Sequence, residues 1–345
     1  MINQHSENLL DTQLENPPGE GYIFSWFDWF CLWYPPGWLI LFNRHWQHYH
    51  TDPDGWNWLE YGLFLIPGGF YLAMLSRWLR LGFRSPRQEI GEFDPKYQQA
   101  FRKEVLGPIV KYYFRGELQQ VENLPQTGPL IVAMNHAGMC FPWDFLTLGY
   151  LLSEARGWVV QPVASPALFE HPWVIWWLPP KWSQVLGGVR AELDNFEAAI
   201  AQDKILLYAP EGIRGPRKGW KRRYQLEKFD VSFIKLSVGA ARRRHRYHIP
   251  ILPVVCIGSE FLHPWAVNFQ KLQRLVKLPF LPFSPIILAL ILFPSMGIWA
   301  VRTRLSYFIQ TWETAEIPNS NKGQTVAYQQ AQKLREKLQF QINQR

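Results

Sequence analysis

The chain is poor in cysteine and in charge, and it contains no long apolar run free of breaks. Its three cysteines, Cys31, Cys140 and Cys256, lie far apart with no paired spacing. That distribution excludes a disulfide-stapled miniprotein and is typical of a reducing compartment. Charged residues make up 19% of the 345 residues and apolar residues 48%, so disorder is excluded over most of the length. The length allows one large domain, or one domain with an appendage.

Aromatic residues and positive charge are abundant instead. Lys and Arg total 36 against 28 Asp and Glu, which leaves a formal charge of +8, and the chain has 18 Trp. Tryptophan favours the boundary between lipid and water because its ring is apolar while its N–H requires a polar partner. A mean hydropathy of −0.17 argues against a transporter with several spans. The composition therefore predicts a basic globular protein that contacts a membrane.

The N-terminal quarter has a different character from the rest. Residues 1–20 are polar and acidic without a positively charged start, so we expect a loose cytoplasmic tail and no secretory signal. Residues 21–85 are expected to form an aromatic-rich, membrane-associating helical region. Its apolar stretches are broken by Pro-Pro-Gly at 35–37 and by Pro-Gly-Gly at 67–69. Such breaks favour short helices lying in the membrane interface, with a spanning hairpin as the alternative.

Residues 86–345 predict an α/β domain with a central, mostly buried sheet flanked by helices. Short apolar runs of the buried-strand type alternate with helix-like segments, a pattern typical of this fold class. The expected strands are 129–134, 205–209 and 249–255, the expected helices are 194–201, 231–241 and a polar terminal helix at 327–342, and a proline-broken apolar segment at 275–300 is expected to face the membrane.

A histidine and an acid follow the first of these strands. His136 lies just past the strand end, where α/β proteins place reactive groups, and Asp144 comes shortly after it. A carboxylate in this position can orient the imidazole ring and stabilise it once it takes a proton. Taken alone, a histidine near an aspartate is more often a packed, satisfied pair than a catalytic one.

Two further blocks carry arginine beside glycine. Pro210-Glu211-Gly212-Ile213-Arg214 follows the second strand, and Gly212 lets a ligand approach the backbone while Arg214 can bind a phosphate through two hydrogen bonds. Arg190 ends the segment Leu186-Gly187-Gly188-Val189-Arg190 and is a second candidate for phosphate binding. The alternative interpretation of each block is a turn with exposed charge.

In this order, and followed by the strand that contains Pro250 and Pro253, these segments resemble the phospholipid/glycerol acyltransferase superfamily, whose members acylate glycerol 3-phosphate and lysophosphatidic acid. The resemblance covers about a third of the chain. One departure concerns the first block, because seven residues separate His136 from Asp144 where the family has four. Asp144 can reach the ring only if this segment bulges outward; otherwise Glu211 is the alternative acid.

The resemblance implies direct acyl transfer without a covalent enzyme intermediate. His136 would act as general base on the acceptor hydroxyl, with Asp144 holding its ring, and backbone N–H groups near Gly138 would stabilise the oxyanion. Arg190 and Arg214 would bind the acceptor phosphate in a pocket shaped by Glu211 and Gly212. The donor would be an acyl thioester of acyl carrier protein or coenzyme A, and no metal or other cofactor is expected.

The expected function is therefore that of a membrane-associated acyltransferase of phospholipid biosynthesis with its active site facing the cytoplasm. The simplest reaction converts lysophosphatidic acid into phosphatidic acid, with membrane lipids as partners and no nucleic acid. Two alternatives stay open: transfer to a neutral alcohol such as diacylglycerol or an isoprenoid alcohol, and an inactive relative that only binds lipid. A metal site at His45, His48 and His50, and a nucleophilic Cys140, are the weaker interpretations of those residues.

Overall fold

In the computed structural model of the chain, the predicted tail at 1–20, Gly138 and Cys140, and half of the predicted apolar segment 275–300 lie outside the described residues. The described residues are 21–84, 86, 91–137, 141–164, 177–179, 181–202, 204–244, 249–265, 267–268, 282–283, 289, 291–316 and 323–345.

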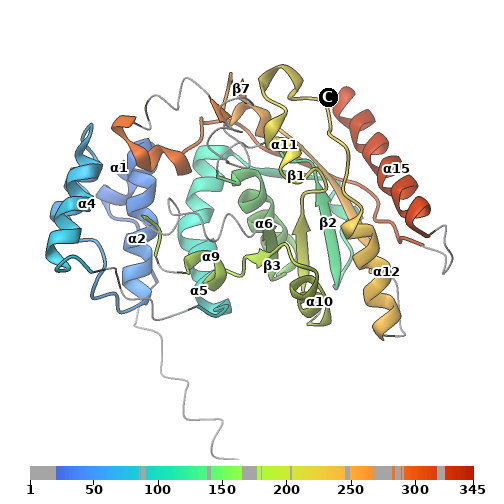
Figure 1. Cartoon of the computed structure of the whole chain (residues 1–345), viewed down its shortest axis with the longest axis horizontal. Helices are drawn as coiled ribbons and strands as arrows, with labels where there is room; N and C mark the ends of the chain where they lie inside the picture. The colour runs from blue at the N-terminus through green and yellow to red at the C-terminus, as the bar shows by residue number, and fades with distance from the viewer. Residues whose placement is uncertain are drawn as a thin grey trace, which may run out of the picture.

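A seven-stranded sheet forms the centre of the α/β part, which confirms the predicted fold class (Figure 1). The strand order is β1-β9-β6-β2-β5-β3-β4, and every neighbouring pair is parallel except the antiparallel pair β6 and β9. The strands are β1 (Glu117–Gln119), β2 (Leu130–Met134), β3 (Val160–Ala164), β4 (Val189–Arg190), β5 (Ile205–Tyr208), β6 (Ile251–Ile257) and β9 (Ser306–Ile309), and β7 (Val267–Asn268) pairs separately with β8 (Pro282–Phe283).

Strand β2 lies between two hydrophobic cores, one on each face of the sheet. Its side chains alternate between them, because successive residues of a strand point to opposite faces. Val132 belongs to the core shared with α6 (Trp143–Arg156) and the N-terminal helices. Ile131 belongs to the core shared with α10 (Leu193–Ala201), α12 (Ser232–Arg244) and α15 (Gly323–Asn343). Burial on both faces explains why the predicted strand is continuously apolar.

Within the described residues, four α-helices precede the α/β part. They are α1 (Trp26–Trp33), α2 (Trp38–Tyr49), α3 (Trp58–Phe64) and α4 (Gly69–Arg80). The predicted breaks at 35–37 and 67–69 separate α1 from α2 and α3 from α4. Helix α1 begins at a capping box, in which the Ser25 hydroxyl accepts from the Asp28 N–H and the Asp28 carboxylate accepts from the Ser25 N–H. Within the described ranges, no helix has both the length and the apolar character needed to cross a membrane.

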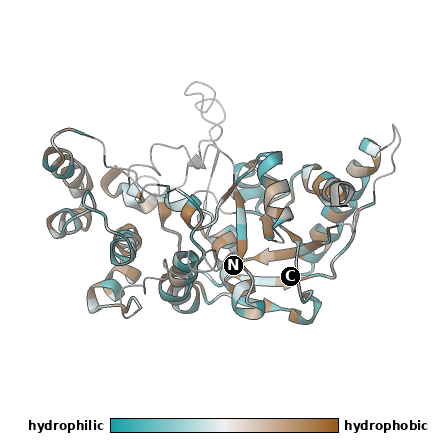
Figure 2. Cartoon of the chain, turned by 90° about the horizontal axis from the view of Figure 1, so that it is seen from below, coloured by the Kyte–Doolittle hydropathy of each residue, from teal (hydrophilic) through white to brown (hydrophobic). Residues whose placement is uncertain are grey.

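The N-terminal helices share a hydrophobic core with one face of the sheet rather than forming a separate unit. Figure 2 shows these helices grouped at one end of the molecule, with apolar residues both along them and in the strands. Trp38 of α2 is fully buried, and its ring lies edge-on to Trp143 at the start of α6, with ring centroids 4.6 Å apart. The Trp143 indole N–H donates to the carbonyl of Ile298. Helix α2 therefore supports the beginning of α6, which carries Asp144.

Two further helical segments matter for the site. Helix α5 (Pro95–Phe101) starts at the N-cap Asp94 and continues into a π-helical segment, η2 (Arg102–Leu106), which is followed by a second one, η3 (Ile109–Phe114). Helix α9 (Trp182–Val185) precedes β4 and contacts α5, since the Trp182 ring meets the Phe101 ring edge-on at a centroid distance of 5.1 Å. The short helix α11 (Arg214–Arg217) follows β5. π-Helical turns are rare and occur frequently at functional sites.

Candidate active site

The predicted site residues follow parallel strands that end at one edge of the sheet. Strands β6, β2, β5, β3 and β4 run in the same direction, so the segments after their carboxyl ends meet at that edge. His136 comes directly after β2, Glu211 after β5, and Arg190 ends β4. This edge is where open α/β sheets bind ligands.

His136 and Asp144 contact each other despite the long segment between them. The His136 Nδ1 and the Asp144 Oδ2 lie 2.8 Å apart, and the Asp144 side chain is completely buried. The second carboxylate oxygen accepts the Phe145 N–H at 3.0 Å, and the Tyr307 hydroxyl donates to the Asp144 main-chain carbonyl at 2.7 Å. The start of α6 thus holds the carboxylate where the partial positive charge of a helix N-terminus favours it.

The opposite side of the imidazole is available for chemistry. With Nδ1–H donated to Asp144, the lone pair lies on Nε2, which makes no hydrogen bond to any residue that the structure describes. The His136 side chain is 16% exposed, so a hydroxyl can reach it. The arrangement is that of a general base oriented by an acid, although the catalytic roles of both residues stay predictions.

Glu211 positions the backbone of His136 rather than its ring. One carboxylate oxygen accepts the His136 main-chain N–H at 3.2 Å, and the other accepts the Glu227 N–H at 2.8 Å and the Lys218 ammonium at 3.1 Å. Glu211 is completely buried and the Lys218 side chain is 3% exposed. The alternative role of Glu211 as the acid beside the ring is therefore not the geometry observed, because Asp144 takes that place.

The loop after β5 packs directly on His136. A Cβ atom on Gly215 would lie 2.4 Å from the His136 carbonyl oxygen, so only glycine allows this approach. Gly212 is exposed and has a φ of +54°, which forms the turn before α11. The side chain of Asn135, which follows β2, reaches Cys256 on the neighbouring strand β6. Its amide oxygen accepts the Cys256 N–H at 2.7 Å, and its amide nitrogen donates to the Cys256 carbonyl at 2.9 Å. The histidine is thus held between β5 and β6.

The two predicted phosphate-binding arginines occupy different places along the edge. Arg214 is exposed at the start of α11, in the loop that packs on His136. Arg190 lies on β4, three strands from β2, which corresponds to about 14 Å between backbones. Its Nε is 3.7 Å from a carboxylate oxygen of Glu192. The predicted oxyanion site at Gly138 lies outside the described residues, so the substrate-binding roles stay predictions.

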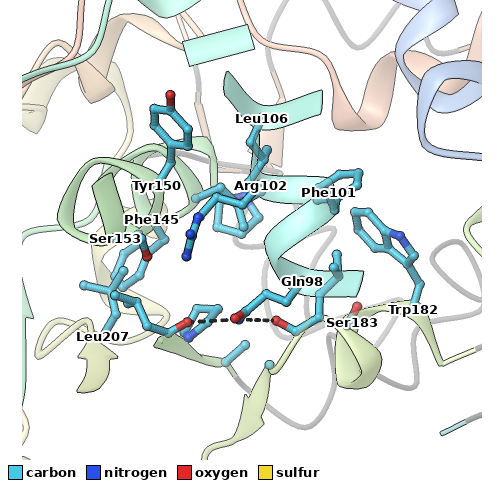
Figure 3. A pocket seen from close by; sticks show the side chains of 18 of the residues that line it. Gln98, Phe101, Arg102, Leu106, Phe145, Tyr150, Ser153, Trp182, Ser183 and Leu207 are labelled. Carbon is cyan, nitrogen blue, oxygen red and sulfur yellow. Dashed lines mark hydrogen bonds between the residues drawn. The ribbon is translucent and has the colours of Figure 1, made fainter. Parts of the chain in front are cut away.

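An apolar pocket of about 130 Å³ lies beside the His136–Asp144 pair, between α6, α5 and the sheet (Figure 3). Phe145 connects the two, because its ring meets the His136 ring edge-on at a centroid distance of 5.0 Å and also lines the pocket. Phe141 and Pro142, from the longer segment between His136 and Asp144, form part of the wall. The other walls include Phe101, Leu106, Gly149, Val160, Leu178, Trp182, Leu186 and Leu207.

Several residues of the site carry no signal that sequence reasoning could use. Lys218 belongs to a run of basic residues, a pattern that usually indicates a solvent-exposed surface, yet its side chain is buried against Glu211. Tyr307 is distant in the chain and reaches Asp144 only through β9. His263 is buried within electrostatic reach of Asp144, and burial lowers the pKa of His263 to about 4, so the ring is neutral at physiological pH. Each of these placements depends on contacts between distant parts of the chain.

The histidine cluster of α2 has structural partners. His45 is buried, with Nε2 at 2.9 Å from Glu104 and Nδ1 at 3.3 Å from the Tyr97 hydroxyl, and burial lowers the pKa of His45. His50 stacks on Trp46 at a centroid distance of 3.8 Å. Among the residues that the structure describes, no group of three or more His, Cys, Asp or Glu side chains is placed to hold a metal ion.

With this geometry established, a family comparison can be set beside it. Residues 115–257 match the family model described as Acyltransferase, and this range contains β1 to β6 with His136, Asp144, Arg190 and Arg214. The match covers less than half of the chain, and over that range it confirms the resemblance to acyltransferases seen in the sequence.

More particular relatives are similar over part of the chain. Uncharacterized protein Rv0502 of Mycobacterium tuberculosis is 28% identical over 208 residues, which cover 59% of this chain and 53% of that protein. Uncharacterized protein ML2427 of Mycobacterium leprae is 27% identical over 208 residues, with 59% and 52% covered. The chain spans about half the length of these curated relatives. Among solved structures, the 1-acyl-sn-glycerophosphate (LPA) acyltransferase PlsC from Thermotoga maritima is similar, with a TM-score of 0.42, 16% identity, and coverage of 80% of this chain and 88% of that one.

Proposed function

We propose that the protein is a membrane-associated O-acyltransferase that transfers a fatty acyl group from an acyl thioester to the hydroxyl of lysophosphatidic acid, giving phosphatidic acid. The observation that carries the proposal is the His136–Asp144 pair, with Nε2 available, beside an apolar pocket that Phe145 joins to it. The donor is the thioester of acyl carrier protein or coenzyme A, and its acyl chain occupies this pocket.

The reaction needs a base that takes the proton of the acceptor hydroxyl and later gives it to the leaving thiolate. Nε2 of His136 removes the proton of the acceptor hydroxyl as its oxygen attacks the thioester carbonyl, and Asp144 stabilises the imidazolium that forms. The tetrahedral intermediate then collapses: the C–O bond is retained, the C–S bond breaks, and the imidazolium returns the proton to the thiolate. Positioned donors for the oxyanion complete the site, and the backbone near Gly138 remains the proposed source.

A panel of acceptors tests the proposal. Purified full-length protein in detergent receives a labelled acyl thioester, of either carrier, with glycerol 3-phosphate, lysophosphatidic acid, monoacylglycerol, diacylglycerol or an isoprenoid alcohol. We expect transfer to lysophosphatidic acid and much slower transfer to the acceptors that lack a phosphate. Transfer to a neutral alcohol alone would contradict the choice of acceptor, and no transfer with either carrier would contradict the proposed activity.

Arg214→Ala is expected to raise the KM for lysophosphatidic acid with little change in the KM for the acyl donor. A charge-assisted hydrogen bond to a phosphate contributes roughly 1.5–3 kcal/mol, which corresponds to about a tenfold to hundredfold increase. Transfer to monoacylglycerol, which has no phosphate, is expected to be insensitive to the change. Lys221→Ala, which removes an exposed charge from the same basic segment, is the matched control. Equal effects on donor and acceptor would show that Arg214 does not bind the phosphate.

An exposed apolar surface on the N-terminal helices supports membrane association. Soluble monomers rarely expose contiguous apolar patches of this kind, and aromatic side chains favour the interface. Helix α4 exposes side chains with helical spacing, and α1 and α3 add tryptophans, Trp26 being 80% exposed. The exposed residues are Trp26, Trp29, Phe30, Trp33, Trp58, Leu59, Ile66, Tyr71, Leu72, Leu75, Trp78, Leu79 and Phe83, together with Ile291 and Leu292.

Replacing Leu72, Leu75 and Leu79 by serine is expected to release the protein from phospholipid vesicles in a flotation assay. All three are about half exposed on α4, so the substitutions remove apolar surface that lipid would cover without opening the core. Partial burial of each side chain contributes up to about 1.5–3 kcal/mol, so binding should weaken at least tenfold. Phe340→Ser, on α15 at the opposite end of the molecule in Figure 1, is the matched control. Unchanged flotation of the triple variant would contradict this docking surface.

A further inference from the structure

The apolar pocket beside His136 contains one buried cation, Arg102. This residue begins the π-helical segment η2, and Figure 3 shows its guanidinium directed among the pocket side chains, toward Ser153. The side chain is only 13% exposed, and its Nε is buried without a hydrogen-bond partner. Its neighbouring carboxylate, Glu154, is 45% exposed, with an oxygen 3.8 Å from Nε, which is too long for a hydrogen bond.

Arg102 lies at the end of the pocket that is remote from His136. Helix α6 lines the pocket from Phe145, whose ring contacts His136, to Ser153. These two residues are eight apart, so they are separated by about 12 Å along the helix axis. Glu154, the neighbour of Ser153, is the residue that faces Arg102. An acyl chain whose thioester lies at His136 would therefore approach the guanidinium with its distal part.

Two other polar side chains of the pocket, those of Gln98 and Ser153, already have partners, whereas the buried indole Nε1 of Trp182 has none among the residues that the structure describes. The Gln98 amide donates to the carbonyls of Val160 and Leu186 at 3.3 and 2.9 Å, and the Ser153 hydroxyl donates to the carbonyl of Trp158 at 2.7 Å. The Nε of Arg102 is buried and makes no hydrogen bond with any of the described residues. A largely buried cation with an unused donor is unfavourable beside a hydrocarbon terminus, and it favours a ligand that brings an acceptor oxygen.

We propose that the pocket selects acyl chains that carry a neutral oxygen, as a hydroxyl or keto group, on their distal part, and that Arg102 binds this oxygen. A neutral group is specified because Glu154 already balances the charge of Arg102, and a carboxylate would be repelled by it. The assignment of the ligand as an acyl donor rests on the proposed function, whereas the binding preference itself does not.

Equilibrium binding tests the preference independently of catalysis. The full chain in detergent is titrated calorimetrically with methyl dodecanoate, methyl ω-hydroxydodecanoate and the monomethyl ester of dodecanedioic acid. We expect the hydroxy ester to bind about tenfold more tightly than the plain ester, and the acid ester to bind less well than the hydroxy ester. Arg102→Met should remove the preference by weakening the hydroxy ester and strengthening the plain one. Lys103→Met, an exposed charge on the next residue, should leave the ratio unchanged.

Several outcomes would overturn the proposal. Equal binding of the plain ester and the hydroxy ester to wild-type protein would overturn it. A preference that persists in Arg102→Met, or tightest binding of the acid ester, would also overturn it. The wild-type ratio decides the question even if the variant does not fold. Failure of acyl transfer with every donor and acceptor, beside an intact binding preference, would overturn the proposed function and leave the pocket specificity in place.

Discussion

Replacing His136 by alanine is expected to abolish acyl transfer while leaving the fold and the binding of acyl chains intact. The imidazole is the one group at the sheet edge with an oriented, unoccupied basic nitrogen among the described residues, and general-base catalysis contributes roughly a factor of 10² to 10⁴. The fold should survive because the ring is partly exposed and the hydrogen bond from its main-chain N–H to Glu211 does not depend on the side chain. The measurement is kcat/KM for lysophosphatidic acid with a labelled thioester, beside thermal unfolding.

The matched control is His48→Ala, which removes an exposed histidine from α2. Asp144→Asn should also lower kcat strongly, because an amide no longer stabilises the imidazolium, while the KM for both substrates changes little. Full acyl transfer by His136→Ala would show that another group is the base. Loss of transfer together with a large fall in unfolding temperature would instead assign His136 a structural role.

Replacing Lys218 by methionine is expected to destabilise the protein by about 3–5 kcal/mol, because Glu211 would stay buried without its counterion. The same change should lower activity, since Glu211 also holds the main-chain N–H of His136. The free energy of unfolding is measured by urea titration followed by circular dichroism. Lys221→Met, in the same basic segment but exposed, should cost little.

A second variant separates the ion pair from the packing of the lysine. In the double variant Lys218→Met with Glu211→Gln, the buried charge is removed on both sides, and part of the lost stability should return. A Lys218→Met protein as stable as Lys221→Met would contradict the buried pair. Loss of stability without any recovery in the double variant would show that the lysine stem, and not its charge, is what matters.

The N-terminal helices link the proposed membrane surface to the His136–Asp144 pair. Trp38 on α2 packs on Trp143, and Trp143 immediately precedes Asp144. The same helical region exposes the apolar residues that the proposed function assigns to lipid. Helix α2 and the start of α6 are therefore joined by buried aromatic contacts, and removing the whole region would expose the core rather than simply detach an anchor.

Local pattern was sufficient for three strands of the sheet and for the breaks between the N-terminal helices. The continuous apolar runs at 129–134, 205–209 and 249–255 correspond to β2, β5 and β6, because a strand buried on both faces needs no polar alternation. The breaks at 35–37 and 67–69 separate helices, because proline and glycine disfavour helix interiors through local backbone geometry. The position of His136 just after a strand, which indicates it as a candidate site residue, is also a local property of the sequence.

By itself, then, the sequence determined the fold class, the N-terminal helical breaks, the acyltransferase resemblance and the residues His136 and Asp144. Only the tertiary structure decided that Asp144 reaches the ring, that Glu211 and Lys218 form a buried pair behind His136, and that Arg102 lies in the pocket. The physical reason is that propensity and periodicity act over a few residues of chain. Burial of a charge and the meeting of two side chains depend instead on which distant segments the sheet order brings to one edge.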